Sequence, residues 1–219
     1  MPRDGKPGLA DSVRCVAAST PLRSIRNDLS AVLLAGGESR RMGTDKATFL
    51  FRGKPLWQVQ LETLRKLRPA EIFLSARTDP SWRSDDVQFI ADIPPSCGPL
   101  SGVAASLAKI HTAHLLALAI DMPWMSSEYI EFLCAQIEPG RGVVAKIGNR
   151  AEPLAAVYPR DAEIDFRTAL AGSDFSLQNV VHHLVTSGKL LEISVTEQER
   201  RLFRNVNNAS DVDATIAGG

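Results

Sequence analysis

The sequence predicts an α/β fold of three layers, with helices on both faces of a mainly parallel central sheet. Short apolar runs rich in β-forming residues alternate with stretches whose apolar residues have helical spacing, which is typical of a parallel sheet covered by helices. The run 114–120 is almost wholly apolar, as expected of a central strand buried on both faces. A length of 219 residues suits one large α/β domain.

The predicted elements follow in order from the first apolar run. A strand at 30–35 ends at a glycine pair, and Pro55 begins an amphipathic stretch to 67, because proline is favourable in the first turn of a helix. Ser126 can cap a later helix that carries Ile130. The other strands are expected at 71–75, 87–91, 114–120, 142–147, 154–158 and 190–195, and the other helices at 100–110, 161–171, 176–184 and 210–216.

Residues 1–28 are predicted to form a flexible N-terminal extension, and residues 29–219 a single domain. The extension has no helical or alternating apolar period, and prolines and glycines break its start. It has no apolar region of the kind that a secretory signal needs, and Asp4, Asp11 and Asp28 argue against an organelle presequence.

Charge and cysteine content narrow the function classes. Lys and Arg together number 25, as do Asp and Glu, so the zero net charge removes the broad electrostatic case for nucleic acid or an anionic membrane as a partner. No apolar run reaches about 18 residues, so we expect no transmembrane helix. The three cysteines form neither a CxxC pair nor a disulfide framework, which favours a reducing cytoplasm.

The loop after the first strand, at 34–46, has the composition of a polyphosphate site. Gly36 and Gly37 allow a sharp turn and a close approach to a ligand, and exposed amides in such a turn can cradle phosphate oxygens. Arg41 and Lys46 add positive charge, which a pyrophosphate leaving group needs. The loop has neither the Walker A nor the GxGxxG spacing; the alternative is a generic glycine-rich turn with solvated arginines.

Two aspartates follow later strands at the same predicted edge of the sheet. Asp92 precedes the segment 97–102, C-G-P-L-S-G, and its carboxylate could accept from the N1–H and the amine of guanine; the alternative is a helix-capping turn. Asp121 follows the most hydrophobic strand and precedes Pro123. A carboxylate there is costly to desolvate without a cation, and Mg²⁺ is the natural partner beside a triphosphate; the alternative is again a helix cap.

The segment 34–46, L-A-G-G-x-S-x-R-M-G-x-D-K, resembles the signature of the molybdenum cofactor guanylyltransferases, nucleotidyltransferases of Rossmann-like fold. The resemblance implies transfer of GMP from MgGTP to molybdopterin that carries molybdenum, with release of pyrophosphate. It implies catalytic roles for Arg41, Lys46 and Asp121, with Asp121 holding Mg²⁺. The residues expected to bind GTP are Leu34, Ala35, Gly36, Gly37, Lys46, Asp92 and Gly98.

The resemblance extends to the acceptor side. The segment 150–158, R-A-E-P-L-A-A-V-Y, resembles a family strand and loop near the acceptor site, so Glu152 is expected to contact the acceptor; the alternative is a structural role for Glu152. The segment 203–207, F-R-N-V-N, resembles the family's F-x-N-V-N-T-P. Asn205 and Asn207 are therefore expected near the pterin, with Asn207 close to the metal. The chain departs from the family at 208–209, where Asn-Ala replaces Thr-Pro, and at 75–77, where Ser-Ala-Arg replaces an Asn-containing run.

The expected reaction is an in-line displacement at the α-phosphorus of GTP by the terminal phosphate of molybdopterin. This nucleophile is already anionic at neutral pH, so catalysis would come from positioning and charge neutralisation. The expected partners are GTP and molybdopterin or molybdenum-molybdopterin, with molybdenum insertion proteins and molybdoenzyme chaperones as further partners. The alternatives are a related enzyme that uses CTP or a sugar-phosphate acceptor, a nucleotide-binding module without catalysis, and a structural or interaction protein.

Overall fold

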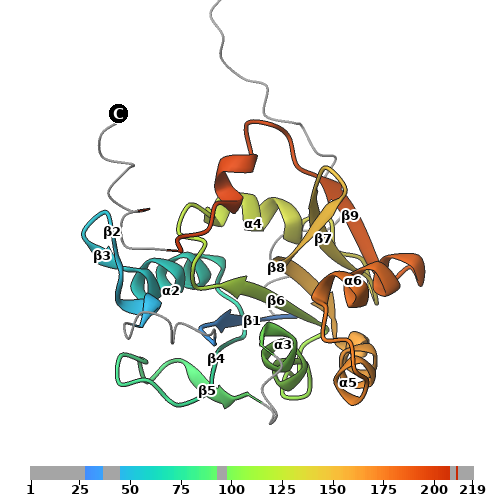
Figure 1. The fold of residues 1–219 in the computed structure, drawn as a ribbon, viewed down its shortest axis with the longest axis horizontal. Helices are drawn as coiled ribbons and strands as arrows, with labels where there is room; N and C mark the ends of the chain where they lie inside the picture. The colour runs from blue at the N-terminus through green and yellow to red at the C-terminus, as the bar shows by residue number, and fades with distance from the viewer. Residues whose placement is uncertain (1–27, 37–44, 93–97, 208–210, 212–219) are drawn as a thin grey trace, which may run out of the picture.

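The computed structural model describes residues 28–36, 45–92, 98–207 and 211. A seven-stranded sheet of order β5-β4-β1-β6-β8-β7-β9 runs through the centre. Helices α2 and α4 lie on one side of it, and α3 and α5 lie on the other (Figure 1). The prediction of a three-layer α/β/α fold with a mainly parallel central sheet is confirmed.

The described elements alternate along the chain much as the sequence predicted. The strands are β1 (Leu29–Leu34), β2 (Leu50–Phe51), β3 (Lys54–Pro55), β4 (Glu71–Ala76), β5 (Gln88–Ala91), β6 (His114–Ala119), β7 (Gly142–Ile147), β8 (Arg150–Pro159) and β9 (Leu190–Ser194). The α-helices are α2 (Leu56–Leu67), α3 (Pro99–Leu107), α4 (Ser127–Cys134), α5 (Glu163–Ala171) and α6 (Leu177–Thr186). Three 3₁₀ turns are η2 (Lys46–Thr48), η3 (Arg160–Ala162) and η4 (Arg200–Phe203).

Strands β1 and β6 form the middle of the sheet, and every residue of both is buried. Strand β1 pairs in parallel with β4 and with β6, and β4 pairs in parallel with β5. The first, third and fourth predicted strands therefore do end at one edge, as the crossover rule requires. Strand β8 runs antiparallel to both of its neighbours, and β7 pairs in parallel with β9.

Two apolar cores lie on opposite faces of the sheet. Leu61 and Leu64 of α2 and Ile130 of α4 belong to one cluster. Val103 of α3 and Phe166 of α5 belong to the other, with residues of α6. Because helices cover both faces, the central strands carry apolar residues at nearly every position rather than at alternate ones.

Most boundary differences are small and have local causes. Helix α2 begins at Leu56, with Pro55 as its N-cap rather than in its first turn. The fixed φ of Pro99 suits the first turn of α3, which begins one residue before the predicted start and ends at Leu107. Ser126 caps α4 as predicted, by accepting from the Tyr129 N–H.

Parts of two predictions lie outside the described residues. Only Asp28 of the predicted extension is described, and its side chain accepts from the Ala113 N–H at 2.9 Å. Of the predicted helix at 210–216, only Asp211 is described. In the described part of the chain, no helix is both long enough and apolar enough to cross a membrane.

The small hairpin of β2 and β3 was not predicted from the sequence. Its two-residue turn consists of Arg52 and Gly53, which have φ angles of +51° and +80°. Two successive positive φ angles are typical of a type I′ turn, whose twist suits a tight hairpin. The hairpin connects η2, at the end of the predicted polyphosphate loop 34–46, to helix α2, whose apolar side packs in the core.

We predict that Gly142→Ala destabilises the sheet strongly, because the added Cβ would lie 2.0 Å from the Val157 carbonyl oxygen. That oxygen belongs to the backbone of β8 and cannot turn aside, so the free energy of unfolding should fall by about 3 kcal/mol, the upper end for overpacking. Urea unfolding measures the change. Gly172→Ala is the control, because its Cβ would meet its nearest atom at 3.4 Å; equal stability of the two variants would contradict the prediction.

Candidate active site

The carboxyl ends of β1, β4, β5 and β6 form one edge of the sheet, and the residues that follow them are joined through the backbone. The Ala35 N–H donates to the Ser75 carbonyl at 2.9 Å, and the Ile120 N–H donates to the Leu34 carbonyl at 3.1 Å. Asp92 follows β5 directly. The loops expected to carry chemistry are thus held together at one place, where ligands of open α/β sheets bind.

Lys46 and Asp121 lie against each other at this edge. The Lys46 ammonium is 3.5 Å from Asp121 Oδ2, and it donates to Asn207 Oδ1 at 3.3 Å. The side chains of Lys46 and Asp121 are 26% and 24% exposed. Three segments far apart in the sequence therefore place an ammonium, a carboxylate and an amide oxygen at one point that solvent can reach.

The segment that carries Asn207 is fixed to the loop after β6. The Val206 N–H donates to the Asp121 carbonyl at 2.8 Å, and the Val206 side chain is fully buried. The Asn207 N–H donates to Asp211 Oδ2 at 2.8 Å. These contacts hold Asn207 beside Lys46, even though the chain departs from the family pattern immediately afterwards, at 208–209.

Asp92 is held beside the first loop by Ser75. The Ser75 hydroxyl, which is buried, donates to Asp92 Oδ1 at 2.9 Å. A Cβ on Gly36 would lie 2.9 Å from Asp92 Oδ2, and a Cβ on Gly102 would lie 2.6 Å from Ser75 Oγ. Glycine at both positions therefore leaves room for the carboxylate and for the hydroxyl that orients it.

A pocket of about 320 Å³ opens beside Asp121. Asp121, Glu152 and Asn205 line it, together with Arg150 and Gln178. The Gln178 amide donates to the Ala151 carbonyl at 2.9 Å, which ties the start of α6 to β8. The pocket thus joins the Lys46–Asp121 pair to residues from β8, α6 and the segment after η4.

Burial raises the pKa of Glu152 above its ordinary value, while the nearby Arg150 guanidinium acts in the opposite direction. Desolvation disfavours the charged form of a carboxyl group, and a neighbouring cation favours it.

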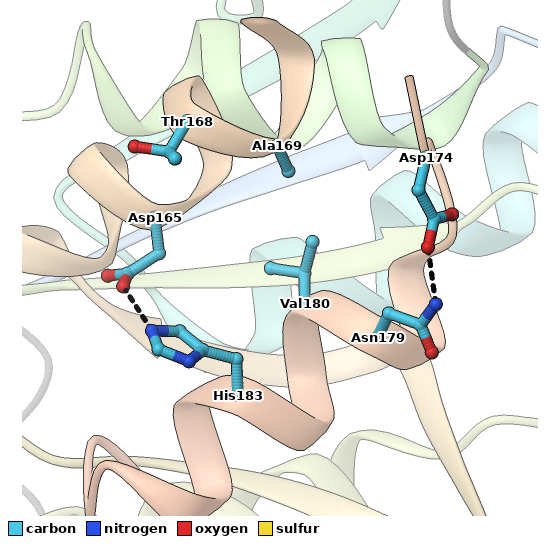
Figure 2. A pocket seen from close by; sticks show the side chains of 7 residues that line it. All are labelled: Asp165, Thr168, Ala169, Asp174, Asn179, Val180 and His183. Atoms are coloured by element: carbon cyan, nitrogen blue, oxygen red, sulfur yellow. Dashed lines mark hydrogen bonds and ion pairs between the residues drawn. The ribbon is translucent and has the colours of Figure 1, made fainter. Parts of the chain in front are cut away.

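A second pocket, of about 390 Å³, lies between α5 and α6 and shares no lining residue with the pocket at Asp121. Figure 2 shows the Asp165 carboxylate facing His183 across it, and Asn179 donating to Asp174 at its other end. Lys189 also pairs with Asp165, at 2.7 Å. The charged and amide side chains of this pocket are thus paired, and the pocket is separate from the cluster at the strand ends.

The structure brings the predicted site residues together in three contacts. Lys46 meets Asp121 and Asn207, Gly36 adjoins Asp92, and the pocket at Asp121 includes Glu152 and Asn205. Leu34 ends β1, Ala35 follows it, and Gly98 stands immediately before α3 with φ at +65°. Gly37 and Arg41 lie outside the described residues.

The donors at the strand ends suit a hard cation that takes further ligands from elsewhere. Among the described residues there is no group of three or more His, Cys, Asp or Glu that could hold a metal ion. Asp121 and Asn207 instead supply one carboxylate and one amide oxygen, both within reach of the Lys46 ammonium. Mg²⁺ is typically held by one or two carboxylates together with substrate phosphates and water, so these residues fit it.

Sequence reasoning missed the roles of Ser75 and Trp82. Ser75 was noted only as a departure from the family pattern, whereas its hydroxyl orients Asp92. The Trp82 indole N–H donates to Asp45 Oδ2 at 3.1 Å, next to Lys46. A serine near the end of a strand gives only a weak sequence signal for such a contact. The contact between Trp82 and Asp45 gives no local signal, because the two residues are 37 positions apart and meet only through the fold.

The chain is similar to proteins of one known family. The family described as "MobA-like NTP transferase domain" matches residues 31–186. The chain is 34% identical over 188 residues to a probable molybdenum cofactor guanylyltransferase from Opitutus terrae, an alignment that covers 84% of this chain and 93% of that protein. A probable molybdenum cofactor guanylyltransferase from Methanosarcina acetivorans is 30% identical, over 85% of this chain and 89% of that protein.

Two solved structures show the same fold. The molybdopterin-guanine dinucleotide biosynthesis protein A from Archaeoglobus fulgidus has a TM-score of 0.67 at 23% identity, covering 84% of this chain and 95% of that chain. A nucleotidyl transferase from Methanothermobacter has a TM-score of 0.70 at 14% identity, covering 88% of this chain and all of that one. With the match over most of its length, the chain is a nucleotidyltransferase and belongs to the family of MobA-like NTP transferase domains.

Proposed function

We propose that this enzyme transfers GMP from GTP to molybdopterin that carries molybdenum, and releases pyrophosphate. The relatives that it matches over most of their length are named molybdenum cofactor guanylyltransferases. The observation that carries the proposal is the meeting of Lys46, Asp121 and Asn207 at the carboxyl edge of the sheet. A nucleoside triphosphate is negatively charged and usually binds with a metal ion, so it suits a point where an ammonium group lies beside oxygen ligands for a metal.

Lys46 neutralises charge on the polyphosphate in this proposal. Its ammonium has three N–H donors, so it can contact phosphate oxygens while it stays near Asp121. Charge builds on pyrophosphate as the bond to the α-phosphorus breaks, and a fixed cation stabilises that charge without reorganisation. Arg41 is proposed to act beside it, from the same loop.

Asp121 and Asn207 are the residues proposed to hold Mg²⁺. The ion, when bound, would act as a Lewis acid on the phosphates and orient them. Until a nucleotide binds, the Lys46 ammonium partly balances the Asp121 carboxylate. The terminal phosphate of the acceptor is anionic at neutral pH, so the chain need supply no general base, and its residues act by positioning.

The base is proposed to bind beside Gly36 and Asp92. With one Asp92 oxygen held by Ser75, the other faces the backbone of the first loop. A carboxylate so presented can accept from the N1–H and the exocyclic amine of guanine. Leu34, Ala35, Gly37 and Gly98 complete the proposed nucleotide site.

The acceptor is proposed to occupy the pocket that Asp121 shares with Glu152 and Asn205. In this proposal the acceptor phosphate approaches the α-phosphorus opposite the pyrophosphate leaving group, as an in-line displacement requires. We also propose that the enzyme acts in the cytoplasm, where molybdenum insertion proteins would supply the acceptor and molybdoenzyme chaperones would receive the product.

Nucleotide choice tests the proposal directly. We expect GTP with Mg²⁺ to raise the thermal midpoint more than CTP, ATP or UTP, because a ligand at 100 times its Kd stabilises the native state by about 2.7 kcal/mol. Only GTP should then give pyrophosphate at a high rate with molybdenum-molybdopterin. Preference for CTP would identify the related cytidylyl activity, turnover with a sugar phosphate would identify another acceptor, and binding without pyrophosphate release would identify a non-catalytic module.

We predict that Lys46→Ala and Asp121→Ala each lower kcat/KM for GMP transfer by about 100-fold, corresponding to about 3 kcal/mol of lost transition-state stabilisation. Steady-state kinetics with varied GTP measures the loss. Lys109→Ala, at an exposed position after α3, removes the same charge away from the site and should change kcat/KM less than twofold. Near-normal transfer by either site variant would refute the assignment of that residue.

Gly36→Ala should weaken guanine nucleotide binding with little effect on stability. The added Cβ would lie 2.9 Å from Asp92 Oδ2, and a carboxylate can swing away at small cost in folding free energy. The displaced carboxylate would no longer face the base, so KM for GTP should rise about tenfold, or about 1.4 kcal/mol. An unchanged KM, with the thermal midpoint also unchanged, would show that Asp92 does not read the base.

A further inference from the structure

The Asp45 carboxylate uses both of its oxygens to shape the turn that carries Lys46. Oδ1 accepts from the Ala47 N–H at 3.0 Å and so caps η2. Oδ2 accepts from the Trp82 indole N–H at 3.1 Å. A carboxylate with a donor on each oxygen cannot rotate freely, so the backbone of Asp45, and with it the start of η2, is fixed in orientation.

Trp82 is itself held on a rigid support. Its ring stacks on Trp57 of α2, with centroids 5.5 Å apart and planes inclined by 15°. The neighbouring Arg83 pairs with Asp79 at 2.7 Å and donates to the Val87 carbonyl at 2.7 Å. The loop after β4 is therefore braced on both sides of the tryptophan, and Trp82 can act as a fixed donor.

A second ion pair fastens this loop to α2. Arg65 donates to both Asp86 oxygens, at 2.9 and 2.7 Å, and to Ser84 Oγ at 2.7 Å. The hydrogen bonds from Arg65 and Ser84 lower the pKa of Asp86 to about 2, so the pair stays charged at neutral pH. The support for Trp82 thus extends from the loop into the helix whose apolar face lies in the core.

We propose that Trp82 is a positioning residue for Lys46. Its indole N–H orients Asp45, Asp45 caps η2, and η2 sets where the Lys46 ammonium meets Asp121 and Asn207. The proposal rests on the proposed function in assigning Lys46 to the polyphosphate. A flexible lysine benefits from such an anchor, since misplacing a catalytic group by about 1 Å can cost about 100-fold in rate.

The test is a double-mutant cycle with Trp82→Phe and Lys46→Ala. Phenylalanine keeps a ring on Trp57 and removes the N–H donor. We expect Trp82→Phe alone to lower kcat for GMP transfer 5- to 20-fold with KM for GTP within threefold, because Lys46 acts chiefly on charge that develops in the transition state. In the Lys46→Ala background the same change should cost less than twofold, because residues that act through one group are not additive.

Two further variants separate positioning from general damage. Trp124→Phe makes the same indole-to-phenyl change at a ring that packs edge-on against Phe51, and it should alter kcat less than twofold. Asp45→Asn keeps the shape of the side chain but has only one oxygen, so its amide N–H group must face the N–H donor of either Ala47 or Trp82. We therefore expect Asp45→Asn to lower kcat as much as Trp82→Phe does. Asp45→Asn also keeps the test decisive if Trp82→Phe folds poorly.

The proposal is overturned if Trp82→Phe and Asp45→Asn lower kcat no more than Trp124→Phe does. It is also overturned if Trp82→Phe or Asp45→Asn lowers kcat by the same factor in the Lys46→Ala background as in the wild-type enzyme. A wild-type enzyme that transfers no GMP would contradict the proposed function alone. Calorimetry with magnesium pyrophosphate then decides the positioning role: Trp82→Phe should weaken binding at least threefold in the wild-type background and less than twofold beside Lys46→Ala, and any other pattern overturns it.

Discussion

The site depends on one interaction, the approach of the Lys46 ammonium to the Asp121 carboxylate and the Asn207 amide oxygen. The three residues come from η2, from the loop after β6 and from the segment after η4. An ion pair at about one-quarter exposure contributes little to stability, because solvent screens it. We propose that its importance is functional, because it holds a cation beside the carboxylate proposed to bind the metal ion, where one polyphosphate could bridge them.

The fold makes this meeting possible through its buried strands. Strands β1 and β6 are wholly buried and pair in parallel, so their carboxyl ends emerge side by side at one edge. Asp92 and Asp121 then lie just beyond the ends of the strands, where water and ligands can reach them. The antiparallel strand β8 contributes Glu152 to the pocket beside Asp121, which places the proposed acceptor next to the proposed nucleotide.

The parts of the structure that the sequence predicted are those with a local cause. Buried apolar runs fix the strands, and the parallel topology then brings Gly36, Asp92 and Asp121 to one edge. The direction of β8 was not predicted, although Gly148 and Asn149 between β7 and β8 form a two-residue connection typical of a hairpin. The contact of Trp82 with Asp45 has no local signal, since it requires the loop after β4 to fold over η2.

The central claim is that one polyphosphate binds to Lys46 and to a metal ion on Asp121. A crystal structure of the enzyme with Mg²⁺ and a non-hydrolysable GTP analogue tests this claim most directly. We expect the Lys46 ammonium to contact phosphate oxygens, Asp121 to coordinate the ion, and the guanine to lie against Asp92. A nucleotide bound elsewhere, or bound here with Lys46 and Asp121 both turned away from its phosphates, would contradict the account.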